Sequence, residues 1–353
     1  MENTRHILRQ VLWLTAIMCI SIGLSGCIEE LRFENQDNDS IFVLDGRITP
    51  DKATVKLSTT TFNNLIEEPV TGAVVRIVSE FGDFLFLTET KTGFYEEETG
   101  AFDVRPGVAY HVEARLSENR VYRSEPDTLP LALAEDDISW QLGSDRGRDV
   151  IVVFSNPSYP DTVGPLYTFW GFTDAFVQTP TDFPDPFNSI PPNCYIERRP
   201  DLQAVTSLSG ERYMGRQAGN LAVGKLFIDA FYDEKHVISV EQYSITKGAF
   251  EYWQLVGRLL EQDGSLFDPP PGLLRGNVSR VGVPSEPVRG YVTMAQFSVS
   301  RFAIYPSDLP GVFIDPCKFD PSRNWGHYPR GCLNCLNLNG ASYIAPDYFF
   351  QVR

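Results

Sequence analysis

The first residues carry the pattern that most constrains where, and therefore how, this chain folds. A short start with two arginines is followed by the mostly apolar stretch Val11–Leu24. That stretch is shorter than the roughly 20 apolar residues of a membrane-spanning helix and has the length of a secretory signal core. Leu24-Ser25-Gly26-Cys27 follows, in which two small residues precede a cysteine that can accept diacylglycerol. We therefore expect residues 1–26 to be a lipoprotein signal peptide, cut just before Cys27.

The residues after Cys27 bear on the final location of the chain. Lipid on Cys27 holds a protein at a membrane without a spanning helix. Residues 27–40 are acidic and polar, as expected for a solvated tether. Glu29 and Glu30 stand where some Gram-negative lipoproteins carry an acidic signal for surface export. We expect a lipid-anchored outer-membrane protein that faces the cell exterior, with the covalent lipid on Cys27 and no other cofactor.

The charge of the chain excludes one class of partner. The net charge is −16 at pH 7, and removing residues 1–26 takes away two arginines and one glutamate, which makes the chain slightly more acidic. So acidic a protein is repelled by nucleic acid and by anionic lipid head groups. We expect no nucleic-acid partner, and we expect membrane contact through the lipid anchor.

The cysteines that remain after cleavage and lipidation are four in number, Cys194, Cys317, Cys332 and Cys335. An even number in an oxidising compartment predicts two disulfides. Because a bridge within Cys332-x-x-Cys335 closes a tight ring, we expect each of these two to pair with a distant cysteine, one with Cys194 and one with Cys317. The runner-up is a zinc site made by Cys317, His327, Cys332 and Cys335.

Short alternating segments separated by turns predict a mainly β fold. In residues 41–132 the strands recur at close spacing, and Tyr110, Val112 and Ala114 alternate with polar residues. This pattern indicates an N-terminal β-sandwich of the Ig or transthyretin kind. Residues 133–305 predict a second β-rich domain, with strands near 226–232 and 237–245 and a long loop at 179–200. Residues 306–353 predict a Cys-rich, irregular C-terminal segment.

One helix is predicted near residues 246–262 of the second domain. Ser244 or Thr246 can cap its start, and Ala249, Phe250 and Trp253 fall on one face at helical spacing. We expect this helix to cover a sheet, with Phe250 and Trp253 as its main contacts.

The sequence offers no recognisable catalytic motif. It has no G-x-S-x-G, H-E-x-x-H, P-loop or G-x-G-x-x-G pattern, and His111 and His236 follow no nucleophile signature. We place His111 on the polar face of a strand and His236 in a hairpin turn. We therefore expect a protein that is not an enzyme, with no catalytic residue assigned.

Several motifs in order carry a family resemblance. They are Val43-Leu44-Asp45-Gly46-Arg47, Pro69-Val70-Thr71-Gly72-Ala73, Ala249-Phe250 with Tyr252-Trp253, Phe267-Asp268-Pro269-Pro270-Pro271 with Gly276-Asn277-Val278, and Cys332-x-x-Cys335. With these motifs the chain resembles domain-of-unknown-function family 4249, a family of outer-membrane lipoproteins of Gram-negative bacteria, over about residues 27–350. The resemblance implies location and architecture and carries no catalytic residue across.

Members of that family often look like neighbours of TonB-dependent outer-membrane transporters. The expected function is therefore a non-enzymatic surface lipoprotein that captures a ligand for, or is an accessory partner of, such a transporter. An adhesin-like or purely structural surface module is the alternative. A hydrolase without a recognisable motif stands third.

Overall fold

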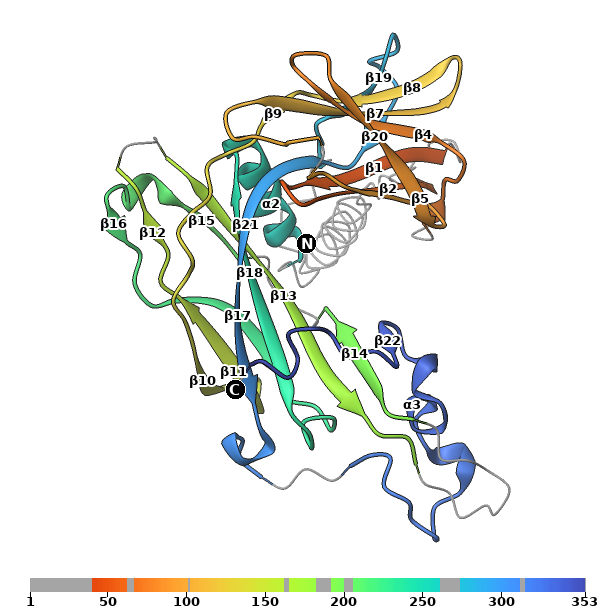
Figure 1. Cartoon of the computed structure of the whole chain (residues 1–353), viewed down its shortest axis with the longest axis vertical. Helices are drawn as coiled ribbons and strands as arrows, with labels where there is room; N and C mark the ends of the chain where they lie inside the picture. The colour runs from red at the N-terminus through yellow and green to blue at the C-terminus, as the bar shows by residue number, and fades with distance from the viewer. Residues whose placement is uncertain are drawn as a thin grey trace, which may run out of the picture. The chain divides into compact units, whose positions relative to one another are not determined.

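The computed structural model describes residues 40–61, 67–100, 102–161, 165–181, 192–199, 206–260, 274–311 and 315–352. The expected signal peptide and residues 27–39 of the expected acidic tether, with Cys27, Glu29 and Glu30, lie outside the described residues, and Ser40 is the first residue of a strand. Within them the fold is mainly β, as the sequence predicts (Figure 1).

The first part of the chain forms the expected sandwich of two sheets. One sheet holds β1 (Ser40–Ile48), β2 (Lys52–Thr61), β3 (Glu68–Pro69) and β6 (Phe94–Glu98). The other holds β4 (Val74–Ser79), β5 (Phe84–Lys91), β7 (Ala109–Ser117), β8 (Arg120–Ser124) and β9 (Asp127–Thr128). β5 pairs with both β4 and β6 and so joins the two sheets.

Alternation along these strands fills the space between the two sheets. Leu44 and Val55 from the first sheet meet Ile77 and Val112 from the second, and all four side chains are fully buried. Because successive side chains of a strand point to opposite faces, the residues between them face outward. The sandwich core therefore follows directly from the period-2 pattern in the sequence.

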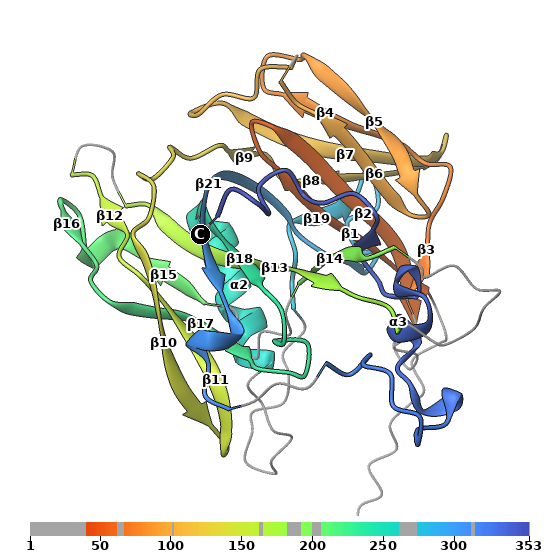
Figure 2. The same cartoon turned by 60° about the horizontal axis from the view of Figure 1, so that its bottom comes forward.

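The second part is built on one large sheet. Its strands are β13 (Tyr167–Gln178), β14 (Cys194–Arg198), β15 (Ser207–Ser209), β18 (His236–Ile245), β21 (Val292–Ile304) and β22 (Ala341–Ser342). A three-stranded sheet of β10 (Ile138–Asp145), β11 (Arg148–Ser155) and β17 (Leu221–Phe227) packs on one face of it through Trp170, Phe172 and Ile238 (Figure 2). The short pair β12 (Ser158–Tyr159) and β16 (Arg216–Gln217) forms a small sheet of its own. It contacts the large sheet through the Tyr159 hydroxyl, which lies 2.7 Å from the Thr168 Oγ1 of β13.

Helix α2 (Lys247–Leu260) covers the opposite face of the large sheet at one end, as predicted. Thr246 precedes it, and its Oγ1 accepts a hydrogen bond from the Ala249 N–H at 3.4 Å. Ala249 and Phe250 are buried against Tyr167 and Tyr243, and Trp253 is half-buried. No described helix is both long enough and apolar enough to span a membrane.

Strand β21 connects the two parts. Its first residues pair in parallel with β1, Gly46 opposite Val292, and its remainder pairs with β18. The short strands β19 (Val278–Arg280) and β20 (Val288–Arg289) also pair with the sandwich, on β8 and β1. Gly290, between β20 and β21, has a φ of 100° and interrupts the extended conformation. A Cβ there would lie 2.1 Å from the Leu44 main-chain oxygen, so only glycine fits. Strands from beyond residue 132 thus complete the sandwich. The division into one domain at 41–132 and a second at 133–305 stays a prediction.

Three local predictions were wrong. The strand expected at 226–232 is β17 and ends at Phe227, because the Asp229 carboxylate accepts from the Phe231 N–H at 3.0 Å and turns the chain. The stretch 179–200, expected to be a loop, contains β14, which pairs with β13. His236, expected in a turn, is the first residue of β18 and is fully buried.

The described part of residues 306–353 has little regular structure. Besides β22, these described residues hold only short helices, which are η2 (Pro306–Asp308), η3 (Trp325–His327), α3 (Arg330–Leu333) and η4 (Cys335–Asn337). One further short helix, η1 (Gly210–Arg212), precedes β16.

Candidate binding face

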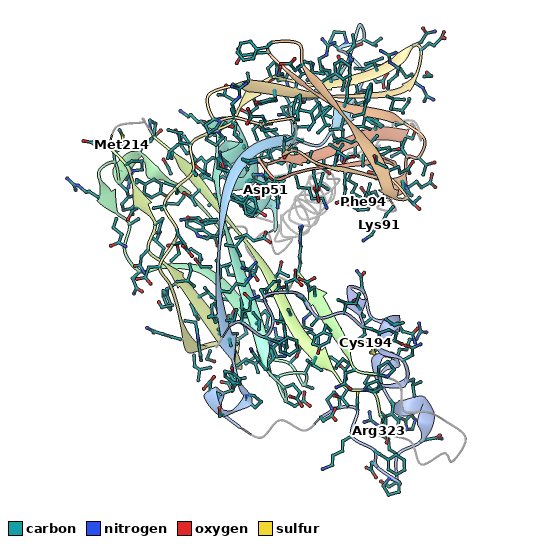
Figure 3. All side chains as sticks on the ribbon, viewed as in Figure 1. Asp51, Lys91, Phe94, Cys194, Met214 and Arg323 are labelled. Atoms are coloured by element: carbon teal, nitrogen blue, oxygen red, sulfur yellow. A yellow bond between two sulfur atoms is a disulfide. The ribbon has the colours of Figure 1, made fainter. Side chains whose placement is uncertain are left out.

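The cysteines form the predicted number and kind of disulfides. Cys335 pairs with Cys194 and Cys332 pairs with Cys317, so each cysteine of the C-x-x-C segment joins a distant partner. Cys194 opens β14, beside the short helices of the tail (Figure 3). The two bridges tie the irregular tail to itself and to the large sheet.

The runner-up zinc site does not form. Cys317, Cys332 and Cys335 are in disulfides and have no thiolate to offer, and His327 is exposed at the end of η3. Within the described ranges, no group of three or more His, Cys, Asp or Glu side chains is placed to hold a metal ion.

His236 lies in a buried polar network rather than in a turn. Its Nδ1 is 2.7 Å from an Asp174 carboxylate oxygen, and its Nε2 is 2.9 Å from the Phe231 oxygen. The ring is stacked between Phe176 and Tyr232, and Arg198 forms an ion pair with the same aspartate at 3.0 Å. With both nitrogens bonded and the side chain fully buried, this histidine holds the start of β18 in place.

The outer face of β5, β4, β7 and β8 carries an unusual group of exposed apolar side chains. Val74 is 52% exposed, Phe84 51%, Phe86 52% and Phe81, in the turn before β5, 71%. Phe84 and Phe86 are two residues apart and touch edge to face with ring centroids 5.2 Å apart. Scattered exposed apolar residues are ordinary, but a group on neighbouring strands marks an interaction surface.

A row of directly opposed residues crosses the same face. Phe86 on β5 is opposite Arg76 on β4, which is opposite Glu113 on β7, which is opposite Arg123 on β8. Cross-strand neighbours lie close enough for their side chains to interact. We call this row, together with Val74, Phe81 and Phe84, the aromatic–arginine face.

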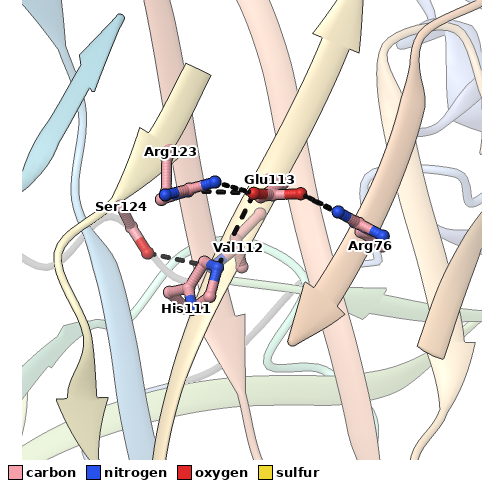
Figure 4. A network of polar contacts seen from close by, with 6 residues as sticks. All are labelled: Arg76, His111, Val112, Glu113, Arg123 and Ser124. Atoms are coloured by element: carbon pink, nitrogen blue, oxygen red, sulfur yellow. Dashed lines mark hydrogen bonds and ion pairs between the residues drawn. The ribbon is translucent and has the colours of Figure 1, made fainter. Parts of the chain in front are cut away.

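Glu113 fixes the two arginines of this face (Figure 4). Arg76 donates two N–H groups to one carboxylate oxygen, with Nε at 2.7 Å, and Arg123 donates two to the other, with Nε at 2.9 Å. The Glu113 side chain is only 7% exposed, whereas those of Arg76 and Arg123 are 32% and 48% exposed. Both oxygens of the carboxylate therefore bind the two arginines within the face. The guanidinium groups are held in fixed positions and are partly exposed to solvent.

The charge on the face follows from this arrangement. Burial alone raises the pKa of Glu113, but the hydrogen bonds from Arg76 and Arg123 outweigh it and hold that pKa below its usual value. Burial, helped by the Arg123 charge, lowers the pKa of His111, which therefore stays neutral at pH 7. Two arginines with one carboxylate leave this face positive, on a chain whose net charge is −16.

Arg76 contacts both the charged and the aromatic side chains of this face. Its guanidinium carbon lies 5.5 Å from the centre of the Phe84 ring, within range of a cation–π contact. Sequence reasoning did not find this face. Alternation within β4 and β7 marks Arg76 and Glu113 as outward residues, but only the register of four strands makes them neighbours.

The family model described as Domain of unknown function (DUF4249) matches residues 28–301, which is most of the chain. The chain belongs to this family. A search of curated proteins found no match. The DUF4249 match covers the sandwich, the large sheet up to Arg301 and helix α2, and it includes the aromatic–arginine face.

Proposed function

We propose that this chain is a non-enzymatic lipoprotein of the outer membrane, exposed to the cell exterior. In this proposal it captures a ligand for, or is an accessory partner of, a TonB-dependent transporter. The lipidation motif Leu24-Ser25-Gly26-Cys27 and the acidic pair Glu29 and Glu30 support the location. The aromatic–arginine face supports a binding role, and it is the observation on which the proposal rests.

The composition of this face favours a protein partner. Aromatic and arginine side chains are enriched at the energetic centres of protein interfaces. Glu113 holds Arg76 and Arg123 before any partner arrives, so little side-chain entropy is lost on binding. Flat sheet faces with exposed rings suit a broad protein surface better than a small molecule, which needs a concave site.

The binding role is tested by site-specific photocross-linking in living cells. A photoreactive phenylalanine analogue replaces Phe86, and in a matched control it replaces Ile344, which is 80% exposed on the tail. We expect irradiation to join the Phe86 position to a TonB-dependent transporter and the Ile344 position to none. No transporter adduct from Phe86, or equal adducts from both positions, would contradict the binding role.

The anchor is tested separately. Cys27→Ala should abolish incorporation of a labelled fatty-acid analogue and release the protein from the membrane fraction. Label retained by the variant would contradict the lipid anchor. Changing Glu29 and Glu30 to neutral residues should lower cleavage by protease added to whole cells, whereas unchanged cleavage would contradict their role in surface export.

A further inference from the structure

Strand β10 lies at the edge of the three-stranded sheet (Figure 2). It pairs with β11 over its whole length, Ile138 opposite Ser155 and Asp145 opposite Arg148, and no other described strand pairs with it. An edge strand presents a row of backbone N–H and C=O groups to its surroundings, which is a template for another strand.

The turn that follows β10 determines which backbone groups face outward. Arg146 and Gly147 have φ of 51° and 78°, the left-handed pair of a two-residue type I′ hairpin. In such a hairpin the flanking residues, Asp145 and Arg148, bond to each other, and bonded and non-bonded pairs then alternate. The N–H and C=O groups of Trp140, Leu142 and Ser144 therefore point away from β11.

The side chains of β10 protect this edge only at its end, where the Asp145 carboxylate lies 3.6 Å from the Lys225 ammonium. From Ile138 to Ser144 the strand has no charged residue and no proline, two of the devices that keep edge strands from pairing. Ile138 and Trp140 pack on the core beneath the sheet, and Trp140 stacks on Phe302 with ring centroids 6.3 Å apart. Leu142 lies on the same face of the strand, yet its side chain is 44% exposed.

We propose that β10 pairs with β10 of a second copy of this chain, antiparallel, about a two-fold axis perpendicular to the sheet. The axis keeps the inner face of one copy continuous with that of the other, so Leu142 gains the partner copy's inner-face residues beside it. The outward N–H and C=O groups of each strand bond to the same groups of the other. A single interface thus provides hydrogen-bond partners for the β10 edge of both copies.

Charge favours a second copy meeting at this place. The chain is strongly acidic, so most surfaces of two copies repel one another. The stretch Ile138–Ser144 is neutral, and a strand edge is complementary to itself in antiparallel pairing. This inference does not depend on the aromatic–arginine face, which lies on another sheet.

The test is the mass of the full mature lipoprotein in mild detergent, measured by sedimentation velocity over a range of concentrations. Leu142→Pro removes one outward N–H without touching the bonds to β11, and Leu142→Lys places a charge at the joint. Leu131→Lys is the matched control, because Leu131 is 41% exposed and lies before β10. Thermal unfolding of each variant checks that it is folded. If Leu142→Pro does not fold, the result for Leu142→Lys alone tests the interface.

We expect a dimer for the wild type and for Leu131→Lys. For both Leu142 variants we expect monomer, with a dissociation constant raised about tenfold or more, since the interface loses packing or a backbone bond. A monomeric wild type at every concentration would overturn the proposal. Dimers of the Leu142 variants as tight as the wild type would overturn it as well.

Discussion

The ammonium group of Lys235 donates a hydrogen bond to the main-chain oxygen of Phe349 at 2.9 Å. It donates a second to the Val352 oxygen at 2.6 Å, and it lies 5.3 Å from the centre of the Phe349 ring. One side chain from the turn before β18 thus holds the last residues of the chain against the large sheet, where Phe349 is buried with Ala175 and Val237.

Lys235→Met should loosen this end of the chain. The variant leaves two carbonyl groups without a charged donor, and hydrogen bonds to charged groups contribute about 1.5–3 kcal/mol each when buried, less here because the site is partly exposed. We expect the free energy of unfolding to fall by about 1–3 kcal/mol and proteolysis near Phe349 to quicken. Lys247→Met is the control, since Lys247 is 65% exposed in an ion pair of 3.9 Å. Equal losses in both variants would contradict this role of Lys235.

Asp127 makes the stability depend on pH. Burial raises its pKa from 3.8 to about 6, although its carboxylate accepts from the Thr246 hydroxyl at 3.1 Å, just before α2. A carboxyl that binds its proton more tightly when folded contributes stability below pH 4, and this contribution is lost as pH rises through 6.

Asp127→Asn should remove that dependence, because the amide keeps an acceptor oxygen for Thr246 and carries no charge. We expect urea unfolding to show the variant about 1–2 kcal/mol more stable than the wild type at pH 7.5 and similar to it at pH 4. Asp137→Asn, at an exposed position, should change neither value. A less stable Asp127→Asn at pH 7.5 would contradict the cost of burying this charge.

Trp253 contributes less than a fully buried tryptophan. Its ring stacks on Phe169 at 5.3 Å and its indole N–H donates to the Thr293 Oγ1 at 3.4 Å, but the side chain is half-buried. Trp253→Ala should cost about 2–3 kcal/mol, below the roughly 3–5 kcal/mol expected for Trp170→Ala, whose side chain is 1% exposed. Chemical denaturation of the two variants measures the order, and a larger loss at Trp253 would reverse it.

The two disulfides should differ in what they contribute. Cys194–Cys335 spans 141 residues of sequence and Cys317–Cys332 spans 15. In the loop-entropy model the first stabilises the fold by about 5 kcal/mol and the second by about 3 kcal/mol. We expect Cys194→Ala/Cys335→Ala to lower the urea midpoint more than Cys317→Ala/Cys332→Ala. The reverse order would show that the model does not describe these bridges.

The sequence predicts best those features that repeat along the chain. Alternation predicted the sandwich strands, helical spacing predicted α2, and the even number of cysteines predicted the disulfides. Features that depend on contacts between distant residues were not predicted. His236 follows three charged residues and looks like part of a turn, but Asp174, from a strand more than sixty positions earlier, accounts for its burial.

The same limit applies to the candidate face. Arg76, Glu113 and Arg123 are ordinary polar residues of their strands in the sequence. Phe84 and Phe86 alternate with Leu85 and Leu87, so the sequence alone does not show which of the two pairs faces outward. Only the register of β5, β4, β7 and β8 brings them into one row and leaves the rings outside. In the same way, nothing local predicts that β21 starts in one sheet and ends in another.

The most direct test of the binding role is the recovery of a TonB-dependent transporter with the affinity-tagged lipoprotein from solubilised membranes. Phe86→Asp places a charge at the β5 end of the aromatic–arginine face, and Ile344→Asp places one elsewhere, on a side chain that is 80% exposed against 52% for Phe86. Loss of an aromatic contact that carries much of the binding energy costs about 2 kcal/mol or more, a factor of about 30 in affinity. We predict strong recovery with the wild type and Ile344→Asp and almost none with Phe86→Asp. Full recovery with Phe86→Asp would contradict the account.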